Sequence, residues 1–155
     1  MENKHILSSF DDDLKKLNDN LLKLGNGALN NFENCINNFG TQDIDEIEKV
    51  INADIILDEL DDKVQKLGFE IIALRAPQAA DLRRVIVALK IATIFERIGD
   101  YSRNISNRTK LLIELNYSDL PGVNIGKMGQ KTLTMIEDVI ESYTNEDDKL
   151  AVKVR

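Results

Sequence analysis

The sequence predicts an all-α fold of long antiparallel helices, with one complete three-helix bundle followed by the start of a second. Apolar residues recur at steps of three and four over long segments, which is the period of a helix with one buried face. Only two prolines, Pro77 and Pro121, interrupt the chain, and no segment alternates between apolar and polar residues as a strand hairpin does. Helices of more than average length are typical of such bundles.

The first two helices are delimited by clear start and stop signals. An apolar stripe runs from Ile6 to Phe39, and Gly40 ends it. Asp43 followed by Glu46 forms a capping box, which predicts that the second helix begins there. The second stripe continues to Arg75-Ala76, because the residue before Pro77 resists helical geometry.

The third and fourth helices follow the two prolines. Pro77 near a first turn and Asp81 close behind it predict a helix over about 78–114. The segment 116–122 contains Pro121 and breaks this helix. A fourth apolar stripe covers about 125–143, and a last short helical segment follows a polar break at 145–148.

The composition excludes several classes of function. The 155 residues carry a net charge of −7, so no surplus of basic side chains is available for a nucleic-acid backbone. No apolar run is long enough for a membrane span, and the amino end lacks the apolar region of a signal peptide. The single Cys35 cannot form an internal disulfide, which favours the cytoplasm, and the single His5 leaves little scope for histidine chemistry.

An internal repeat appears when the chain is compared with itself at an offset of 104 residues. Leu24-Gly25 then aligns with Met128-Gly129, and Lys49-Val50 aligns with Lys153-Val154, without a gap between them. This predicts a first three-helix unit over 1–115, a linker over 116–124 and an incomplete second unit over 125–155. Because the last segment lacks the helices that would cover it, we expect it to pack on the first bundle in a different way, to swap between chains, or to fray.

Two pairs of carboxylates suggest a metal site. Glu96 and Asp100 lie four residues apart on the third helix, and Asp54 and Asp58 repeat that spacing on the second. The short turn between these helices brings the pairs to nearly the same level. Oxygen-only ligands suit hard cations, so a metal is predicted here, with iron, manganese, magnesium, zinc and calcium left open. The Glu-x-x-His motifs of the familiar di-iron bundles are missing from the chain.

Further features of the third helix complete this prediction. Along one side of this helix the residues change from apolar to acidic and polar halfway along. A second line of residues, on the opposite side, is apolar and is expected to pack there. The members of the first line are Leu82, Leu89, Thr93, Glu96, Asp100, Asn104 and Asn107, and those of the second are Val87, Ile91, Ile94, Ile98 and Ile105. In the alternative interpretation the acids form a solvated face with Arg97 and Arg103. Cys35 is expected to be a core residue, and His5 is given no role.

Two motifs resemble those of the PhoU family, the accessory proteins of phosphate transport. The segment from Arg75 to Arg83, RAPQAADLR, is similar to the family's turn-and-helix signature. The segment from Glu96 to Asp100, ERIGD, with Asn104-Ile105 after it, is similar to the Glu-x-x-x-Asp signature. The resemblance implies two tandem three-helix bundles, of which this chain would hold one full motif copy. It also implies that Glu96, Asp100, Asp54 and Asp58 hold metal, including iron clusters in some members.

The resemblance further implies a cytoplasmic homodimer that negatively regulates the phosphate-starvation response. Such a protein would contact the ATPase subunit of the phosphate importer and a sensor histidine kinase, without enzymatic activity of its own. Two alternatives remain from the residues themselves. One is a metal-dependent hydrolase in which a carboxylate serves as the base. The other is a helical scaffold whose acidic residues are merely solvated.

Overall fold

A computed structural model of the chain describes residues 2–39, 41, 43–117 and 124–154, with side chains from residue 9 onward. It contains five helices, namely α1 (Glu2–Asn38), α2 (Ile44–Arg75), α3 (Ala79–Glu114), α4 (Ile125–Thr144) and α5 (Asp148–Val154). The all-α prediction is confirmed, and the described residues contain no strand. In this part of the chain, no helix has the length and apolar character needed to cross a membrane.

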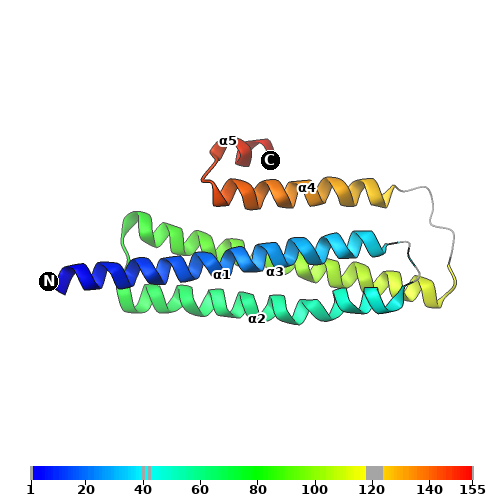
Figure 1. Cartoon of the computed structure of the whole chain (residues 1–155), viewed down its shortest axis with the longest axis horizontal. Coiled ribbons are helices and arrows are strands. Elements are labelled where there is room, and N and C mark those ends of the chain that lie inside the picture. Colours follow the sequence, from blue (N-terminus) through cyan, green and yellow to red (C-terminus); the bar gives the residue numbers. More distant parts are fainter. Residues whose placement is uncertain (1, 40, 42, 118–123, 155) are drawn as a thin grey trace.

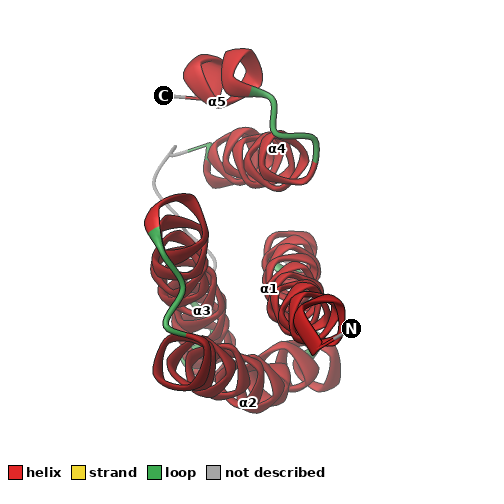
Figure 2. Ribbon diagram, turned by 90° about the vertical axis from the view of Figure 1, so that its left-hand side faces the viewer, coloured by secondary structure: helices red, strands yellow, loops and turns green. Residues whose placement is uncertain are grey.

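Helices α1, α2 and α3 form an elongated antiparallel bundle in which each helix packs against the other two (Figure 1). Helix α4 lies along α1, and the short α5 packs on α4 (Figure 1). Seen from the end, α5 sits on the far side of α4 from the bundle (Figure 2). The chain therefore builds one complete three-helix unit with a helical extension against its first helix.

The expected capping signals shape both ends of α2. The Asp43 carboxylate accepts a hydrogen bond of 3.1 Å from the Glu46 amide, which satisfies one of the free donors at the helix start. At the other end Ala76 adopts a left-handed conformation with φ of 43°, and its N–H donates to the Ile72 carbonyl. Pro77 follows at once, so the chain turns sharply into α3.

The core of the bundle differs from the prediction along α3. The deepest stripe of α3 consists mainly of small residues, namely Val85, Ala88, Ala92, Phe95, Gly99, Ser102, Ser106 and Thr109. In the second predicted apolar line, Ile91, Ile98 and Ile105 are partly buried against the core. Val87 and Ile94 are exposed, at 45% and 57%, so the expected packing holds for three of the five residues and is wrong for these two. Small side chains form the buried face because they let α3 approach both α1 and α2 closely.

Helix α4 packs tightly onto α1 through an apolar face. Leu133, Ile136 and Ile140 are buried in the same core cluster as the three-helix bundle. A Cβ atom added to Gly129 would lie 2.6 Å from the Cγ2 atom of Ile36, so a larger residue at this crossing would force Ile36 to shift. Residues 125–144 therefore add to the core of the first unit within a single chain.

The helix boundaries repeat with the offset found in the sequence. Helix α2 starts at Ile44 and α5 starts at Asp148, which are 104 positions apart. The Asp147 side chain accepts from the Leu150 amide at 3.0 Å, as the Asp43 side chain does from Glu46. The limits of the two units and of the linker stay a prediction, and residues 118–123 of the linker lie outside the described residues.

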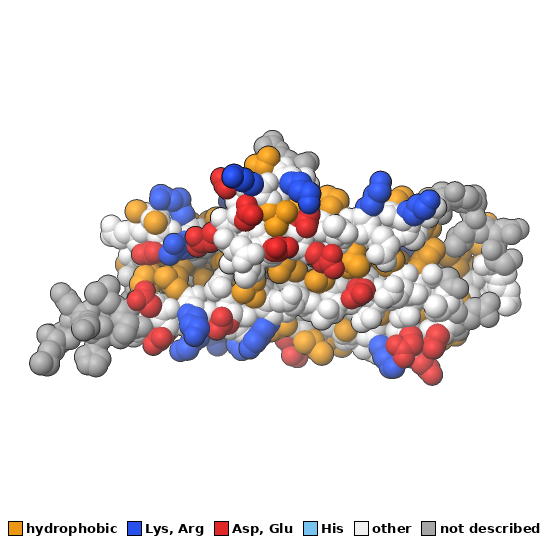
Figure 3. Space-filling model, turned by 45° about the horizontal axis from the view of Figure 1, so that its top comes forward, with side chains coloured by type: hydrophobic (Ala, Val, Ile, Leu, Met, Phe, Trp, Pro, Cys, Tyr) orange, Lys and Arg blue, Asp and Glu red, His pale blue; other side chains and the backbone are white. Residues whose placement is uncertain are grey.

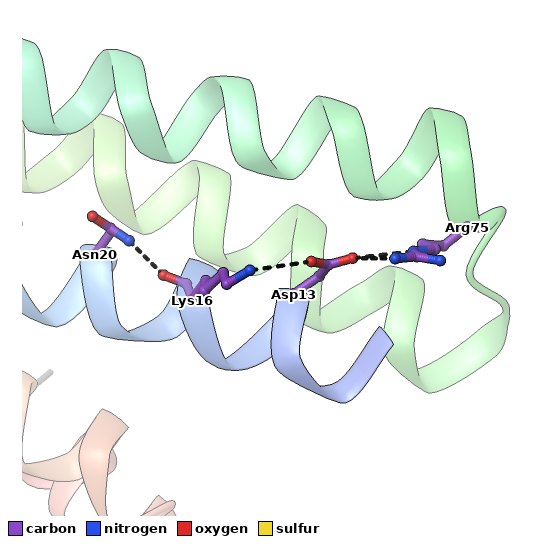
Figure 4. A network of polar contacts seen from close by, with 4 residues as sticks. All are labelled: Asp13, Lys16, Asn20 and Arg75. Carbon is purple, nitrogen blue, oxygen red and sulfur yellow. Dashed lines mark hydrogen bonds and ion pairs between the residues drawn. The ribbon is translucent and has the colours of Figure 1, made fainter. Parts of the chain in front are cut away.

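A polar network ties the α2–α3 turn to α1 (Figure 4). The Arg75 guanidinium donates from Nη2 and Nε to one oxygen of Asp13, at 2.7 and 3.1 Å. The Nζ atom of Lys16 lies 3.9 Å from the other carboxylate oxygen of Asp13, and the Asn20 side-chain amide donates to the Lys16 carbonyl (Figure 4). Both Arg75 and Asp13 are about one-third exposed, so this pair contributes at most about 1 kcal/mol to stability.

Candidate carboxylate site between α2 and α3

The four predicted carboxylates lie on the α2 and α3 helices that pack against each other, but in different environments. Asp54 is only 2% exposed and belongs to the buried face of α2. Glu96 and Asp100 on α3 are partly buried, while Asp58, one turn along α2 from Asp54, is exposed. The pairs therefore share one helix interface, with Asp54 as its innermost member.

Leu57 and Gly99 bring the two helices together at this level. A Cβ atom added to Gly99 would lie 2.5 Å from the Cδ1 atom of Leu57 and 3.2 Å from the Oδ1 atom of Asp54. On the opposite side, a Cβ atom added to Gly27 of α1 would lie 2.8 Å from the other methyl group of Leu57. Two glycines therefore enclose Leu57, and the α3 backbone comes next to the Asp54 carboxylate.

Arg103 joins two of the predicted carboxylates. Its Nη1 donates to the Oδ2 atom of Asp54, and its Nη2 donates to the Oδ1 atom of Asp100. The first bond crosses from α3 to α2, and the second spans three residues within α3. Charge-assisted bonds of this kind are stronger than neutral ones, so the guanidinium connects the two helices at the site.

Asp54 is only partly satisfied by this contact. Its Oδ1 atom is buried and has no hydrogen-bond partner among the described residues. Burial raises the pKa of Asp54 above its ordinary value, because removal from water disfavours the charged form. The Arg103 charge opposes this effect, whereas Asp58 and Asp100 add to it.

Glu96 experiences repulsion from several neighbouring acids. Burial is the main cause that raises its pKa, and the charges of Asp100, Asp58 and Asp61 raise it further. The influence of Asp58 and Asp61 on Glu96 agrees with the expectation that the α2 and α3 carboxylates face each other. Asp61 was not selected from the sequence, although it lies one turn beyond Asp58 on α2.

Gln65 provides a second polar connection beside the site. Its side-chain amide donates to Asp61 on its own helix at 3.1 Å, and to the Leu89 carbonyl and the Thr93 hydroxyl of α3 at 3.3 Å. Neither Gln65 nor the bridging role of Arg103 was predicted. The sequence shows how far Gln65 and Arg103 lie from the acids on their own helices. Which residue each contacts on the other helix depends on how the helices are rotated about their axes.

The arrangement does not fit a metal ion as it stands. The all-oxygen donor set and the unpartnered Asp54 oxygen suit a hard cation. However, the Arg103 guanidinium lies between Asp54 and Asp100. Across the described ranges, no three histidine, cysteine, aspartate or glutamate side chains form a group that could hold a metal ion. A metal at these residues would require the guanidinium to move away.

Cys35 is a core residue, as expected. It is 2% exposed on α1, and burial raises the pKa of its thiol, while a hydrogen bond with Ser106 of α3 lowers it. A buried thiol with a raised pKa is a poor nucleophile at neutral pH. His5 lies outside the residues whose side chains are described.

Comparisons with known proteins identify relatives over the region that contains these residues. The family model described as "PhoU domain" matches residues 21–109, which include both carboxylate pairs and Arg103. A "Phosphate-specific transport system accessory protein PhoU homolog" of Caulobacter vibrioides (strain NA1000 / CB15N) is 36% identical, with 69% of this chain and 46% of that protein covered. A homolog of the same description from Xylella fastidiosa (strain 9a5c) is 31% identical, with 99% of this chain and 64% of that protein covered. The chain thus spans about half to two-thirds of these relatives' length.

Solved structures show the same fold. The crystal structure of PhoU from Pseudomonas aeruginosa superimposes with a TM-score of 0.88 at 24% identity, covering 93% of this chain and 69% of that one. The phosphate transport system regulatory protein PhoU from Streptococcus pneumoniae gives a TM-score of 0.83 at 24% identity and covers 94% and 68% of the two chains. On the match of the family model to more than half of its residues, the chain belongs to the PhoU family.

Proposed function

We propose that this chain acts as a regulatory accessory protein of phosphate uptake. The observation that carries the proposal is the family match over residues 21–109, which includes the ERIGD segment and its carboxylate partners on α2. Relatives over this region are named as accessory proteins of the phosphate-specific transport system. In this role the protein works in the cytoplasm as a homodimer, contacts the importer ATPase and a sensor histidine kinase, and negatively regulates the phosphate-starvation response.

The surface of α3 offers a candidate face for these contacts. Val87, Ile94 and Tyr101 follow one another at intervals of seven residues, so they share one side of the helix, and each is about half exposed. Val87 also lines a groove of about 810 Å³ between α1, α3, α4 and α5. On the face that carries α4 and α5, hydrophobic side chains are exposed between charged ones (Figure 3). Apolar side chains within a charged rim are typical of protein interfaces.

Binding and regulation are tested together in cells that lack the gene. The full gene product should restore repression of a phosphate-starvation reporter in phosphate-rich medium and should co-purify with the importer ATPase or the kinase. Val87→Glu should reduce both, whereas Ile56→Glu, at a residue exposed on α2, should not. A protein that binds neither partner and leaves the reporter unchanged would contradict the proposal.

Metal binding at Glu96, Asp100, Asp54 and Asp58 stays a prediction of this proposal. It is tested by metal analysis of the purified protein and of the double variant Glu96→Ala, Asp100→Ala. The matched control is Glu137→Ala, Glu141→Ala, which removes two exposed acids at the same spacing on α4. Equal metal content in the parent and the first double variant would place the metal elsewhere.

A metal-dependent hydrolase remains the second candidate from the sequence. Such an enzyme needs an open metal position next to a general base. In the present arrangement Arg103 occupies the space between Asp54 and Asp100. We therefore give the regulatory role precedence and assign no catalytic residue.

A further inference from the structure

We propose that a trough between α3 and α4 binds an amphipathic helix of a regulatory partner. The inference rests on the proposed function, because it takes the partner from the regulatory contacts of that role, and it adds the mode of binding and the chemistry of the bound segment. The walls of the trough are formed by Val87, Ile94 and Tyr101 of α3 and by Met128, Met135 and Val139 of α4.

The arrangement of the helices leaves room for one more helix beside α3 and α4. Both helices pack against α1, but along the described residues they do not pack against each other. Viewed from the end, α1, α3 and α4 stand at three corners of a rough square, and no described helix stands at the fourth (Figure 2). A groove of about 810 Å³ opens between them, with Leu17 and Ala88 in its lining. Packed helices lie about 8 to 10 Å apart, so a helix at the fourth corner would contact both α3 and α4.

The α3 wall of the trough is apolar and open to solvent. Val87, Ile94 and Tyr101 recur every seven residues, and they are 45%, 57% and 55% exposed. Val87 lines the groove, so the side of α3 that carries these three residues faces the trough.

The α4 wall has the same character. Met128, Met135 and Val139 share one side of α4 and are 62%, 50% and 37% exposed. Val139 lines the groove opposite Val87, so this side of α4 faces the trough as well. Apolar residues that are exposed together on two neighbouring helices indicate an interaction site, unlike single apolar residues scattered over a surface.

The walls favour a helix as the bound segment. Both are sides of helices, whose backbone N–H and C=O groups are already paired with each other. An extended segment in the trough would bury backbone groups without partners, whereas a helix satisfies its own. Helix α4 has 20 residues and is about 30 Å long, so a partner helix of about 20 residues would span the trough. Amphipathic helices bind hydrophobic grooves in this way, with an apolar residue at every third or fourth position.

Charged residues at one end of the trough determine what the flanks of the partner helix should carry. Arg83 and Arg84 line the groove from α3, and Glu146 and Asp148 line it from the end of α4 and the start of α5. Burial raises the pKa of Tyr143 in this groove, while the charge of Arg84 opposes that rise, so Arg84 acts across the groove. A complementary helix carries acidic residues on the flank next to α3 and basic residues on the flank next to α4.

The test selects such a helix from a library of displayed peptides about 20 residues long. Leucine is fixed at every third or fourth position, and the two flanks are randomised among Glu, Lys and Gln. Selection against the 155-residue chain should yield binders with micromolar dissociation constants that carry Glu on one flank and Lys on the other. Binding of a selected peptide, followed by fluorescence anisotropy, should be at least about tenfold weaker with Ile94→Glu and with Met135→Glu, because each buries a charge in an apolar contact.

Two further variants control the interpretation. Ile56→Glu adds the same charge at an exposed residue of α2, outside the trough, and should bind the peptide as the parent does. Arg84→Glu should weaken binding by about threefold or more, and exchange of Glu for Lys on the matching flank of the peptide should restore it. Circular dichroism checks that each variant is folded. In the parent, the peptide should shift the amide NMR signals of Ile94 and Met135 but not that of Ile56.

The outcomes distinguish the occupants of the trough. Absence of binders, or binding that is equally tight in the parent, Ile94→Glu and Met135→Glu, would overturn the inference. A parent dimer that Ile94→Glu dissociates in light scattering would assign the trough to a second copy of the chain. A longer gene product in which Ile94 and Met135 are protected from hydrogen exchange without peptide would assign it to the protein's own chain. Either result would overturn the partner helix.

The inference and the proposed function can fail separately. If Ile94→Glu abolishes peptide binding but leaves repression of the phosphate-starvation reporter intact, the regulatory role stands and its contacts lie outside the trough. If the protein binds neither the importer ATPase nor the kinase and leaves the reporter unchanged, the proposed function fails, and the regulatory partner of this inference fails with it.

Discussion

Replacement of Gly99 by alanine should destabilise the protein, although alanine normally favours a helix. The added Cβ atom would lie 2.5 Å from Leu57 Cδ1 and 3.2 Å from Asp54 Oδ1. Leu57 is buried, and Gly27 confines its other methyl group, so the side chain has little room to retreat. Overpacking of this kind costs up to about 3 kcal/mol. The better helix propensity of alanine returns about 1 kcal/mol, so we expect a net loss of about 2 kcal/mol.

The measurement is urea unfolding followed by circular dichroism at 222 nm. Gly126→Ala is the matched control, because nothing lies within 4 Å of the added atom on α4. This control should be neutral or more stable by up to about 1 kcal/mol. In a Leu57→Ala background, Gly99→Ala should no longer destabilise and should show a coupling of about 3 kcal/mol. A Gly99→Ala variant as stable as the parent, or equally destabilised in both backgrounds, would refute this packing.

Two further predictions follow from the pKa shifts. The pKa of Glu96 is raised in the folded protein, so the folded state holds this proton more tightly than the unfolded state. Ionisation of Glu96 therefore lowers the free energy of unfolding as the pH rises from about 4 through the folded pKa. Glu96→Gln should therefore be more stable than the parent at pH 7 by several tenths of a kcal/mol, and as stable as the parent below about pH 4. The control Glu70→Gln, at an exposed residue, should not show this gain at pH 7. Cys35, whose pKa is raised by burial, should react with a thiol reagent only in urea, and rapid reaction of the native protein would contradict its place in the core.

The sequence predicted the helices well because their limits depend on local chemistry. The Asp43 cap, the Ala76-Pro77 turn and the apolar period act over a few residues, and the structure confirms each. The packing of α3 was predicted less well because the prediction rested on the spacing of its large apolar residues. Its buried face instead uses residues such as Ala92 and Ser102, whose small size matters only once the neighbouring helices are known.

The candidate site was predicted in composition but not in detail. The spacing of Asp54 and Asp58 against Glu96 and Asp100 predicted four acids on two neighbouring helices, and the structure places them on α2 and α3, while their role as a site stays a prediction. The complete burial of Asp54 and the bridge made by Arg103 depend on the rotation of each helix about its axis, which the spacing leaves open. The same acids therefore agreed with a metal site and with a solvated face, whereas the structure pairs the buried Asp54 and the partly exposed Asp100 with the partly exposed Arg103.

The central claim is that Arg103 holds α2 and α3 together through Asp54 at the carboxylate site, and a double-mutant cycle tests it most directly. The free energy of unfolding is measured for the parent, Asp54→Asn, Arg103→Met and the double variant. Hydrogen bonds to charged groups contribute about 1.5 to 3 kcal/mol, so we predict a coupling energy of at least about 1.5 kcal/mol. A coupling energy below about 0.5 kcal/mol would mean that the two side chains act independently and would contradict the account.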